Sequence, residues 1–263
     1  DQLTSGTTWH AAGLMTTYGS STETALNIRR YSRELYARLE AETGQQTGFA
    51  PVGFIELATD ADRLEEQRRV AAFNRYHGNE VIELLPTEVK DLFPLANVDD
   101  IVAGFYSPSD GRINPVDITM ALAKGARMKG ATLLQNTPVE DVLIRRGEVY
   151  GVRTAQGDIR CEFVVNCAGM WARQLGEKSG VCIPNQAAEH YSLITDDIPG
   201  MSRDLPILED PSLYSYYREE VGGLMIGLFE KDCAPWRVDG IPGDFSFGEL
   251  PPDWDRLTPF IEN

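Results

Sequence analysis

The chain has 263 residues, of which 42% are hydrophobic, and its formal net charge is −16 from 40 acidic and 24 basic side chains. This length can bury a sizeable core in one large or two small domains, and the negative charge disfavours nucleic acid and anionic membrane surfaces as partners. No apolar run approaches the ~18 residues that cross a bilayer, so we expect neither a membrane span nor a signal peptide.

The first 130 residues are predicted to alternate helices with short strands. Ser20 and Glu23 have capping-box spacing, and the helical periodicity after them predicts a helix over 21–43. A second, highly charged helix is expected to begin at Asp60 and end at Gly78. The remaining elements predicted here are strands at 52–57, 81–85 and 101–106, a short helix at 86–92, and a helix that Asn114 caps, Pro115 opens and Gly130 ends.

Residues 131–165 are predicted to be mostly strand. The strands are expected at 133–134, 139–145, 148–154 and 159–165, with glycine-bearing turns at Arg146-Gly147 and Gln156-Gly157. The run that starts at Phe163 is apolar and leads through Ala168-Gly169 into a helix. This pattern is typical of a buried parallel strand whose carboxyl end faces a ligand. From residue 183 onward the sequence is β-rich, with a proline-rich tail.

The phosphate-binding motif of a dinucleotide-binding unit is not found in this sequence. Such a unit carries G-x-G-x-x-G after its first strand, and the glycines at 222, 223 and 227 have the wrong spacing. Because one unit needs only ~30 residues, we expect it upstream of Asp1, in a longer protein from which both ends have been cut. Four scattered cysteines without a CxxC pair indicate a reducing compartment and no metal site.

A tryptophan and a histidine, Trp9 and His10, lie side by side in a run of small residues. Gly6 and Gly13 flank this run and allow the backbone to turn sharply and approach a bulky partner. On local chemistry alone, the more frequent explanation is a loop histidine that caps a helix or bonds a nearby carbonyl.

Four segments, in the same order, resemble the D-amino-acid-oxidase-type FAD-dependent oxidoreductases and, within them, the dimethylglycine/sarcosine dehydrogenase group. They are the Thr-Thr-Trp-His-Ala-Ala-Gly string, Asp110 to Pro115, Val164 to Ala172, and the region from Glu189 to Gly227. The resemblance implies a mixed α/β fold in which a Rossmann-like FAD-binding domain is interleaved with a mixed-sheet substrate-binding domain. The implied FAD-binding domain comprises 1–48 and 107–186, and the implied substrate-binding domain comprises 49–106 and 187–263.

The resemblance also implies roles for individual residues. His10 would carry FAD covalently, since a neutral imidazole can attack the 8α carbon of the oxidised ring. His190 and Tyr216 would be catalytic, because either side chain can accept, position or relay the proton of the amine. The other residues implied to bind the cofactor are Thr7, Thr8, Trp9, Ala12, Gly13, Leu14, Val139, Ala168, Gly169 and Trp171.

Three further positions bear on the substrate pocket. If the segment is a strand, Tyr216 and Tyr217 point to opposite faces, so only one of them can line the pocket. Ser192 stands where the related proteins often have tyrosine, which leaves the substrate preference open. We expect Arg218 to form a surface salt bridge rather than to bind a substrate carboxylate.

The implied function is FAD-dependent oxidative demethylation of a small N-methylated amino acid of the dimethylglycine or sarcosine type. Tetrahydrofolate is implied as a further cofactor outside these residues, and either an electron-transferring flavoprotein or oxygen would accept the electrons. Two alternatives stay open: another amine or amino-acid oxidoreductase of the same superfamily, or a non-catalytic regulatory relative with a degenerate flavin site. The expected location is the cytoplasm in a bacterium and the mitochondrial matrix in a eukaryote.

Overall fold

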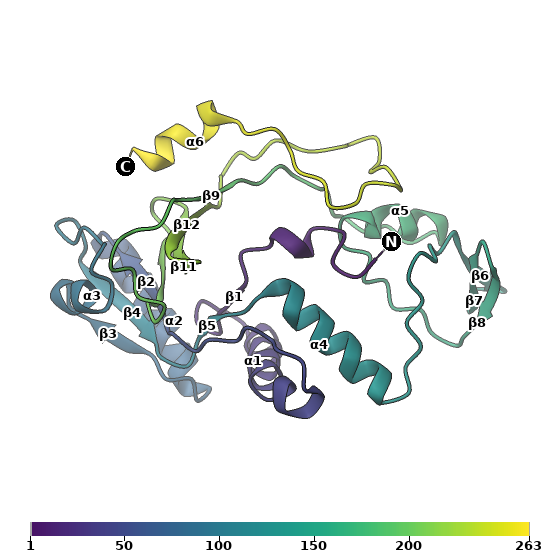
Figure 1. Cartoon of the computed structure of the whole chain (residues 1–263), viewed down its shortest axis with the longest axis horizontal. Coiled ribbons are helices and arrows are strands. Elements are labelled where there is room, and N and C mark those ends of the chain that lie inside the picture. Colours follow the sequence, from purple (N-terminus) through teal and green to yellow (C-terminus); the bar gives the residue numbers. More distant parts are fainter. Residues whose placement is uncertain (1, 263) are drawn as a thin grey trace. The chain divides into compact units, whose positions relative to one another are not determined.

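The computed structural model describes residues 2–262, which form two compact units (Figure 1). The first unit contains residues 2–9, 132–189 and 232–251, and the second contains residues 10–131, 190–231 and 252–262. These boundaries differ from those of the two predicted domains. The assignment of the two predicted domains to FAD and to substrate therefore stays a prediction.

A seven-stranded mixed sheet forms the centre of the second unit, in the order β3-β4-β2-β10-β11-β12-β9. β10 pairs with β2 in parallel, and the other neighbouring pairs are antiparallel. The predicted mixed α/β fold is thereby confirmed. The strands are β2 (Phe54–Ala58), β3 (Ile82–Leu84), β4 (Ala103–Ser107), β9 (Ser192–Ile194), β10 (Ile207–Asp210), β11 (Ser215–Glu220) and β12 (Gly223–Leu228).

Each face of this sheet has its own core, because successive side chains of a strand point to opposite faces. On one face, Phe54, Phe105 and Ile207 pack with Tyr18. On the other face, Ile55 and Leu208 belong to the cluster that contains Val89. The first of these faces also carries Glu56, Glu209 and Tyr216, since each lies two positions from, or directly across from, a residue of that face.

The four helices predicted in the first half of the chain are confirmed, and their ends follow the capping residues. They are α1 (Glu23–Thr43), α2 (Ala61–Tyr76), α3 (Pro86–Leu92) and α4 (Pro115–Met128). Asp60 and Asn114 cap α2 and α4 as predicted, whereas Thr22 rather than Ser20 caps α1. The Ser20 hydroxyl instead donates to the carbonyl of Thr17 at 3.1 Å.

Helices α1 and α4 lie side by side (Figure 1) and share a small core of Leu39, Ile118 and Ala121. A further helix, α6 (Trp254–Ile261), lies in the tail for which the sequence predicted no helix. Its cap is Asp253, which accepts from the amide of Arg256. None of the helices among residues 2–262 is both long enough and apolar enough to cross a bilayer.

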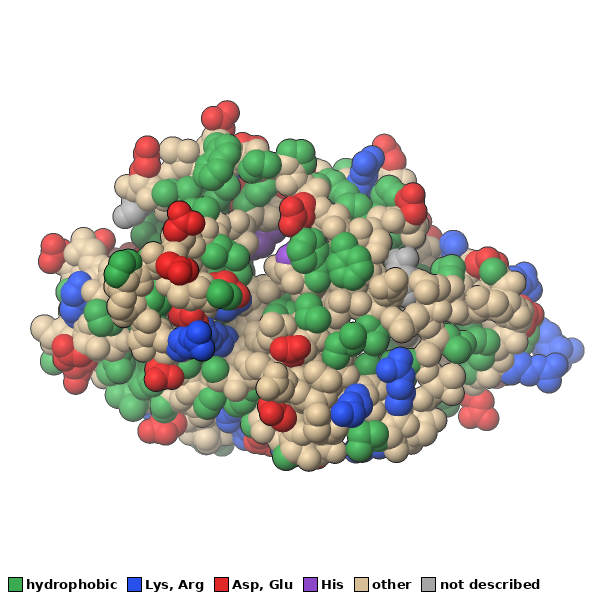
Figure 2. All heavy atoms as spheres, viewed as in Figure 1, with side chains coloured by type: hydrophobic (Ala, Val, Ile, Leu, Met, Phe, Trp, Pro, Cys, Tyr) green, Lys and Arg blue, Asp and Glu red, His purple; other side chains and the backbone are tan. Residues whose placement is uncertain are grey.

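The first unit contains the predicted three-stranded meander, formed by β6 (Asp141–Arg145), β7 (Glu148–Thr154) and β8 (Gly157–Arg160). The turn between β6 and β7 has positive φ at Arg146 and Gly147, 56° and 84°, as a two-residue hairpin turn requires. Helix α5 (Ala172–Lys178) follows later in the chain. Basic side chains gather over the meander, whereas acidic ones are spread over the visible surface (Figure 2).

Two predictions for this unit are wrong. Leu133 and Leu134 are not in a strand, and the last strand of the meander ends at Arg160 instead of continuing to Val165. Phe163 and Val165, expected in a buried parallel strand, are 83% and 82% exposed. The physical reason is the lack of backbone partners: a buried parallel strand needs a neighbour on each side, and no strand within the described range pairs with this segment.

Candidate active site

Tyr216 lies on the sheet face that carries Glu56 and Glu209, and its side chain is 3% exposed. In β11 it pairs with Glu209 of β10 on one side and with Gly227 of β12 on the other. Tyr217 points to the opposite face and packs against the core there, so the predicted alternation is confirmed.

Gly227 gives Tyr216 the space that its ring occupies. A Cβ atom at position 227 would clash with the tyrosine ring, so the ring leans across the glycine towards β12. Just beyond, the ring of Phe229 lies 5.1 Å from that of Tyr216 and 5.9 Å from the His190 imidazole. The structure thus brings both predicted catalytic residues next to the same phenylalanine.

Replacing Gly227 by alanine is expected to displace the Tyr216 ring, because the new methyl group occupies the same space. Overpacking of this kind costs about 1–3 kcal/mol. Chemical denaturation measures the loss, and Gly243→Ala is the matched control, since nothing lies within 4 Å of its Cβ position. Equal stability of the two variants would contradict the close approach of Tyr216 to Gly227.

Burial shifts the pKa values of His190 and Tyr216 in the directions that keep both side chains neutral. Burial lowers the pKa of His190, Glu230 opposes this shift, and Arg256 adds to it. Burial also raises the pKa of the Tyr216 phenol, with a smaller opposing effect from Arg218. At neutral pH the histidine is therefore a proton acceptor and the tyrosine a hydrogen-bond donor.

Arg218 lies two residues from Tyr216 on the same face, and the expectation of a surface salt bridge is wrong in one respect. The arginine does form an ion pair, with Glu220 at 2.5 Å, but it is only 6% exposed. In β11 it lies directly opposite Met225 of β12, which is buried as well. Its Nε–H group has no hydrogen-bond acceptor.

Two carboxyl groups on this face were not identified from the sequence. Glu56 and Glu209 are directly paired in the parallel strands β2 and β10, so their side chains are neighbours. Burial and, to a smaller extent, the nearby Glu56 raise the pKa of Glu209 to about 7. The sequence offers no signal that these residues are neighbours, because only the pairing of the strands places positions 56, 209 and 216 in one row across the sheet.

The segment that follows His10 is held against the start of α4 in the second unit. His10 ends a short 3-10 helix (Thr8–His10), and its side chain is exposed. Leu14, at the start of β1 (Leu14–Met15), pairs with Arg112 of β5 (Gly111–Arg112), and the Gly13 carbonyl accepts from the amide of Ile113 at 2.8 Å. Gly13 has φ +70°, and a Cβ there would collide with the Ile113 carbonyl, so this position requires glycine.

Ala12 also lies in the second unit, beside His10, whereas the other predicted cofactor residues lie in the first unit. A Cβ atom on Gly6 would lie 3.4 Å from the Trp171 ring. The backbone segment that leads to Thr7 and Thr8 therefore passes beside Trp171. The Trp171 indole donates to the Pro242 carbonyl at 3.2 Å, and Trp9 lies 6.2 Å from Phe247 between ring centres. Of the rest, Ala168 and Gly169 lead into the 3-10 helix Gly169–Trp171, and Val139 is exposed before β6.

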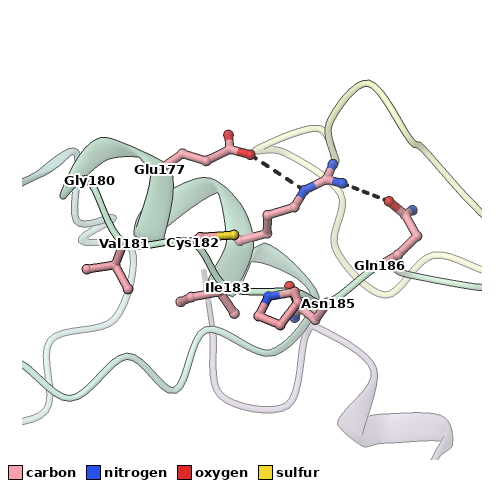
Figure 3. A pocket seen from close by; sticks show the side chains of 9 residues that line it. Glu177, Gly180, Val181, Cys182, Ile183, Asn185 and Gln186 are labelled. Atoms are coloured by element: carbon pink, nitrogen blue, oxygen red, sulfur yellow. Dashed lines mark hydrogen bonds and ion pairs between the residues drawn. The ribbon is translucent and has the colours of Figure 1, made fainter.

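A cavity of ≈ 550 Å³ lies beside α5 in the first unit and contains none of the predicted site residues. Figure 3 shows its wall, in which Arg173 bonds to Gln186 at 2.8 Å and approaches Glu177 at 3.8 Å. The cavity also exposes the Cys182 thiol. Asn185 also lines the cavity, and its Oδ1 atom is buried without a hydrogen-bond partner. Because none of the predicted site residues lines this cavity, the Tyr216 face is the candidate site.

The carboxylate of Asp110, just before β5, holds the Thr17–Tyr18 segment and helix α1 in place. It is fully buried, and its carboxylate accepts from the Thr17 amide at 2.8 Å, from the Thr17 hydroxyl at 2.7 Å and from the Tyr18 amide at 3.0 Å. Arg33 of α1 forms an ion pair with it at 3.3 Å. The segment Asp110 to Pro115 was quoted for its resemblance, but this structural role of its first residue was not predicted.

The mixed sheet carries the buried Tyr216 next to Phe229, with the exposed His190 next to the same phenylalanine, and comparison with known proteins identifies the class of this domain. The family model described as DAO, FAD dependent oxidoreductase, matches residues 1–263. The chain therefore belongs to the DAO family of FAD-dependent oxidoreductases. The suspected resemblance is confirmed.

Individual proteins of this family are similar to nearly the whole chain. Dimethylglycine dehydrogenase from Rattus norvegicus is 39% identical over 99% of this chain, and sarcosine dehydrogenase from Homo sapiens is 35% identical over 100% of it. The chain spans only 31% and 29% of the lengths of these proteins. The crystal structure of L-proline dehydrogenase from P. horikoshii superposes with a TM-score of 0.83 and 24% identity, covering 97% of this chain and 65% of that one.

The residues around His10 fit the flavin that this family uses. The imidazole is exposed, and Ala11, Ala12 and Gly13 beside it have no bulky side chain that would block a planar ring. The chemistry of a neutral aromatic nitrogen also suits attachment to an electrophilic carbon. By contrast, residues 1–263 contain no G-x-G-x-x-G loop for the phosphates.

Proposed function

We propose that the protein to which this chain belongs catalyses FAD-dependent oxidative demethylation of a small N-methylated amino acid. One observation carries the proposal: the rings of His190 and Tyr216 both lie next to Phe229, and burial shifts the pKa of each towards its neutral form. The similarity to dimethylglycine and sarcosine dehydrogenases supports the substrate class.

The chemistry assigns distinct tasks to these residues. Bound FAD supplies the acceptor for a hydride from the N-methyl carbon. The amine must be neutral before the hydride leaves, and the neutral His190 imidazole can accept a proton at this stage. The protonated Tyr216 phenol can hold the substrate by donating a hydrogen bond, and the ring of Phe229 lies next to both residues.

We further propose that His10 is the covalent attachment point of the flavin. Its exposure and its small neighbours support this role, and the segment that follows is fixed by the Gly13–Ile113 hydrogen bond. A fixed tether would keep the ring in one position relative to the second unit in which His10 lies.

The proposal predicts that Tyr216→Phe and His190→Gln, made in the complete protein, slow flavin reduction by dimethylglycine or sarcosine by about 10²-fold, the usual contribution of a positioned proton-transfer group. Anaerobic stopped-flow absorbance measures this rate. Tyr217→Phe is the matched control, because this neighbouring tyrosine faces the other side of the sheet and accepts a hydrogen bond from Ser215 at 3.0 Å.

Two results would contradict the proposal. Failure of the wild-type protein to be reduced by any N-methylated amino acid would remove the activity and would favour the non-catalytic regulatory alternative. Reduction by amino acids without an N-methyl group, at a higher rate, would instead favour another amino-acid oxidoreductase of the same family.

A further inference from the structure

Glu209 is the titratable neighbour of Tyr216 that the proposed mechanism does not yet use. The two residues are directly opposite in the antiparallel pair β10–β11, where side chains on one face have Cβ atoms about 5 Å apart. The Tyr216 ring leans away from Glu209, across Gly227. This leaves the carboxyl group of Glu209 next to the tyrosine, partly exposed rather than covered by its ring.

The charges around Glu209 leave it without a fixed counter-ion. On the β2 side lies Glu56, which accepts a hydrogen bond from Gln67 of α2. The Tyr18 hydroxyl bonds in turn to Gln67 at 2.6 Å. From α1, Arg29 acts on Glu209 only through space, and among residues 2–262 no cation forms an ion pair with it.

A second observation on the same face points to a ligand of mixed charge. Arg218 lies diagonally across from Glu209, a relation that separates Cβ atoms by about 7 Å. It is 6% exposed and pairs with Glu220 at 2.5 Å, but its Nε–H donor is buried without an acceptor. The carboxyl group of Glu209 and this unpartnered donor, with Tyr216 beside both, offer one partner each for the ammonium and the carboxylate of an amino-acid zwitterion.

We propose that Glu209 is a catalytic residue that binds the substrate ammonium group and takes its proton, a step in which it replaces His190 as the first acceptor and leaves His190 to position the neutral amine. The inference rests on the proposed function and identifies the substrate as a zwitterionic amino acid, oriented with its ammonium towards Glu209. In this step the N–H bond of the ammonium breaks and an O–H bond forms on the carboxylate, so that the nitrogen regains its lone pair and no electron is transferred.

The environment of Glu209 suits this exchange. Burial and the neighbouring Glu56 raise the pKa of Glu209 to about 7, with Arg29 opposing them, so both forms of the carboxyl are accessible near neutral pH. Burial raises the pKa of Glu56 as well. A group poised in this way can accept a proton from the substrate and release it to solvent in a later step.

The test uses Glu209→Gln in the complete protein, with Glu83→Gln as the matched control. Glu83 lies in β3 at the edge of the same sheet, where it pairs with the exposed Arg68. We expect the rate of flavin reduction by dimethylglycine to rise with pH through about 7 in the wild type and in the control. In Glu209→Gln the rate should fall by about 10²-fold and this rise should disappear.

A second readout, independent of activity, is the thermal midpoint between pH 5 and pH 8. A raised pKa in the folded state favours the protonated form, so the stability contributed by Glu209 is greatest below about 4.5 and falls as pH rises towards 7. Glu209→Gln should flatten this fall while remaining folded.

The outcomes separate the two proposals. A rate profile of Glu209→Gln that matches Glu83→Gln overturns the role of Glu209 alone. Absence of wild-type reduction by N-methylated amino acids overturns the proposed function and, with it, this assignment. A flattened stability profile with an unchanged rate profile also overturns the inference, because it shows a titrating group without a catalytic role.

Discussion

Asp110→Ala is expected to lower the free energy of unfolding by about 3–5 kcal/mol. The substitution leaves Arg33 without its carboxylate partner and leaves the amides of Thr17 and Tyr18 without an acceptor in a fully buried position. Removing one member of a buried pair in this way is strongly destabilising. Urea denaturation followed by circular dichroism measures the change.

Asp100→Ala provides the control for this prediction, since the same substitution there affects an exposed side chain. A surface change of this kind is expected to stay within about 0.5 kcal/mol. If Asp110→Ala lost no more stability than the control, the carboxylate would not hold the Thr17–Tyr18 segment as described.

His10→Ala in the complete protein is expected to abolish covalent flavin. The imidazole nitrogen is the proposed point of attachment, and alanine offers no nucleophile in its place. After denaturation and gel electrophoresis, flavin fluorescence should remain with the wild-type band and be absent from the variant.

The matched control for the flavin experiment is His77→Ala. His77 is one of the other two histidines, and its ring lies at the end of α2, tilted against that of Phe73 with 4.5 Å between the ring centres. Its loss should leave the fluorescence of the band unchanged. Covalent flavin in His10→Ala would remove the role proposed for this residue, whereas its absence from the wild type would leave only non-covalent binding.

Helices were the most predictable elements of the fold because their signals are local. Asp60 and Asn114 mark the starts of α2 and α4, and Pro86 marks the start of α3. Each of these residues either directly precedes the helix that it starts or is its first residue. The segment from Phe163 to Val165 has an equally clear apolar pattern, yet it forms no strand. A strand is defined by its partners, and the sequence of the strand itself does not say whether they are present.

The candidate site was predictable in part, for a similar reason. His190 and Tyr216 were found through the resemblance, and the alternation of Tyr216 with Tyr217 follows from the two-residue period of a strand. Glu209 carries no motif, and its proximity to Glu56 arises from a parallel pairing between residues far apart in sequence. The burial of Arg218 likewise depends on which part of the sheet is covered.

The fit of Tyr216 across Gly227 makes these two positions interdependent in any redesign of the pocket. A side chain at 227 is compatible only with a smaller residue at 216, and a smaller residue at 216 alone leaves an unfilled space beside Phe229. Paired substitutions should therefore be better tolerated than either single one. A library that varies both positions together would therefore reach combinations that stepwise substitution excludes.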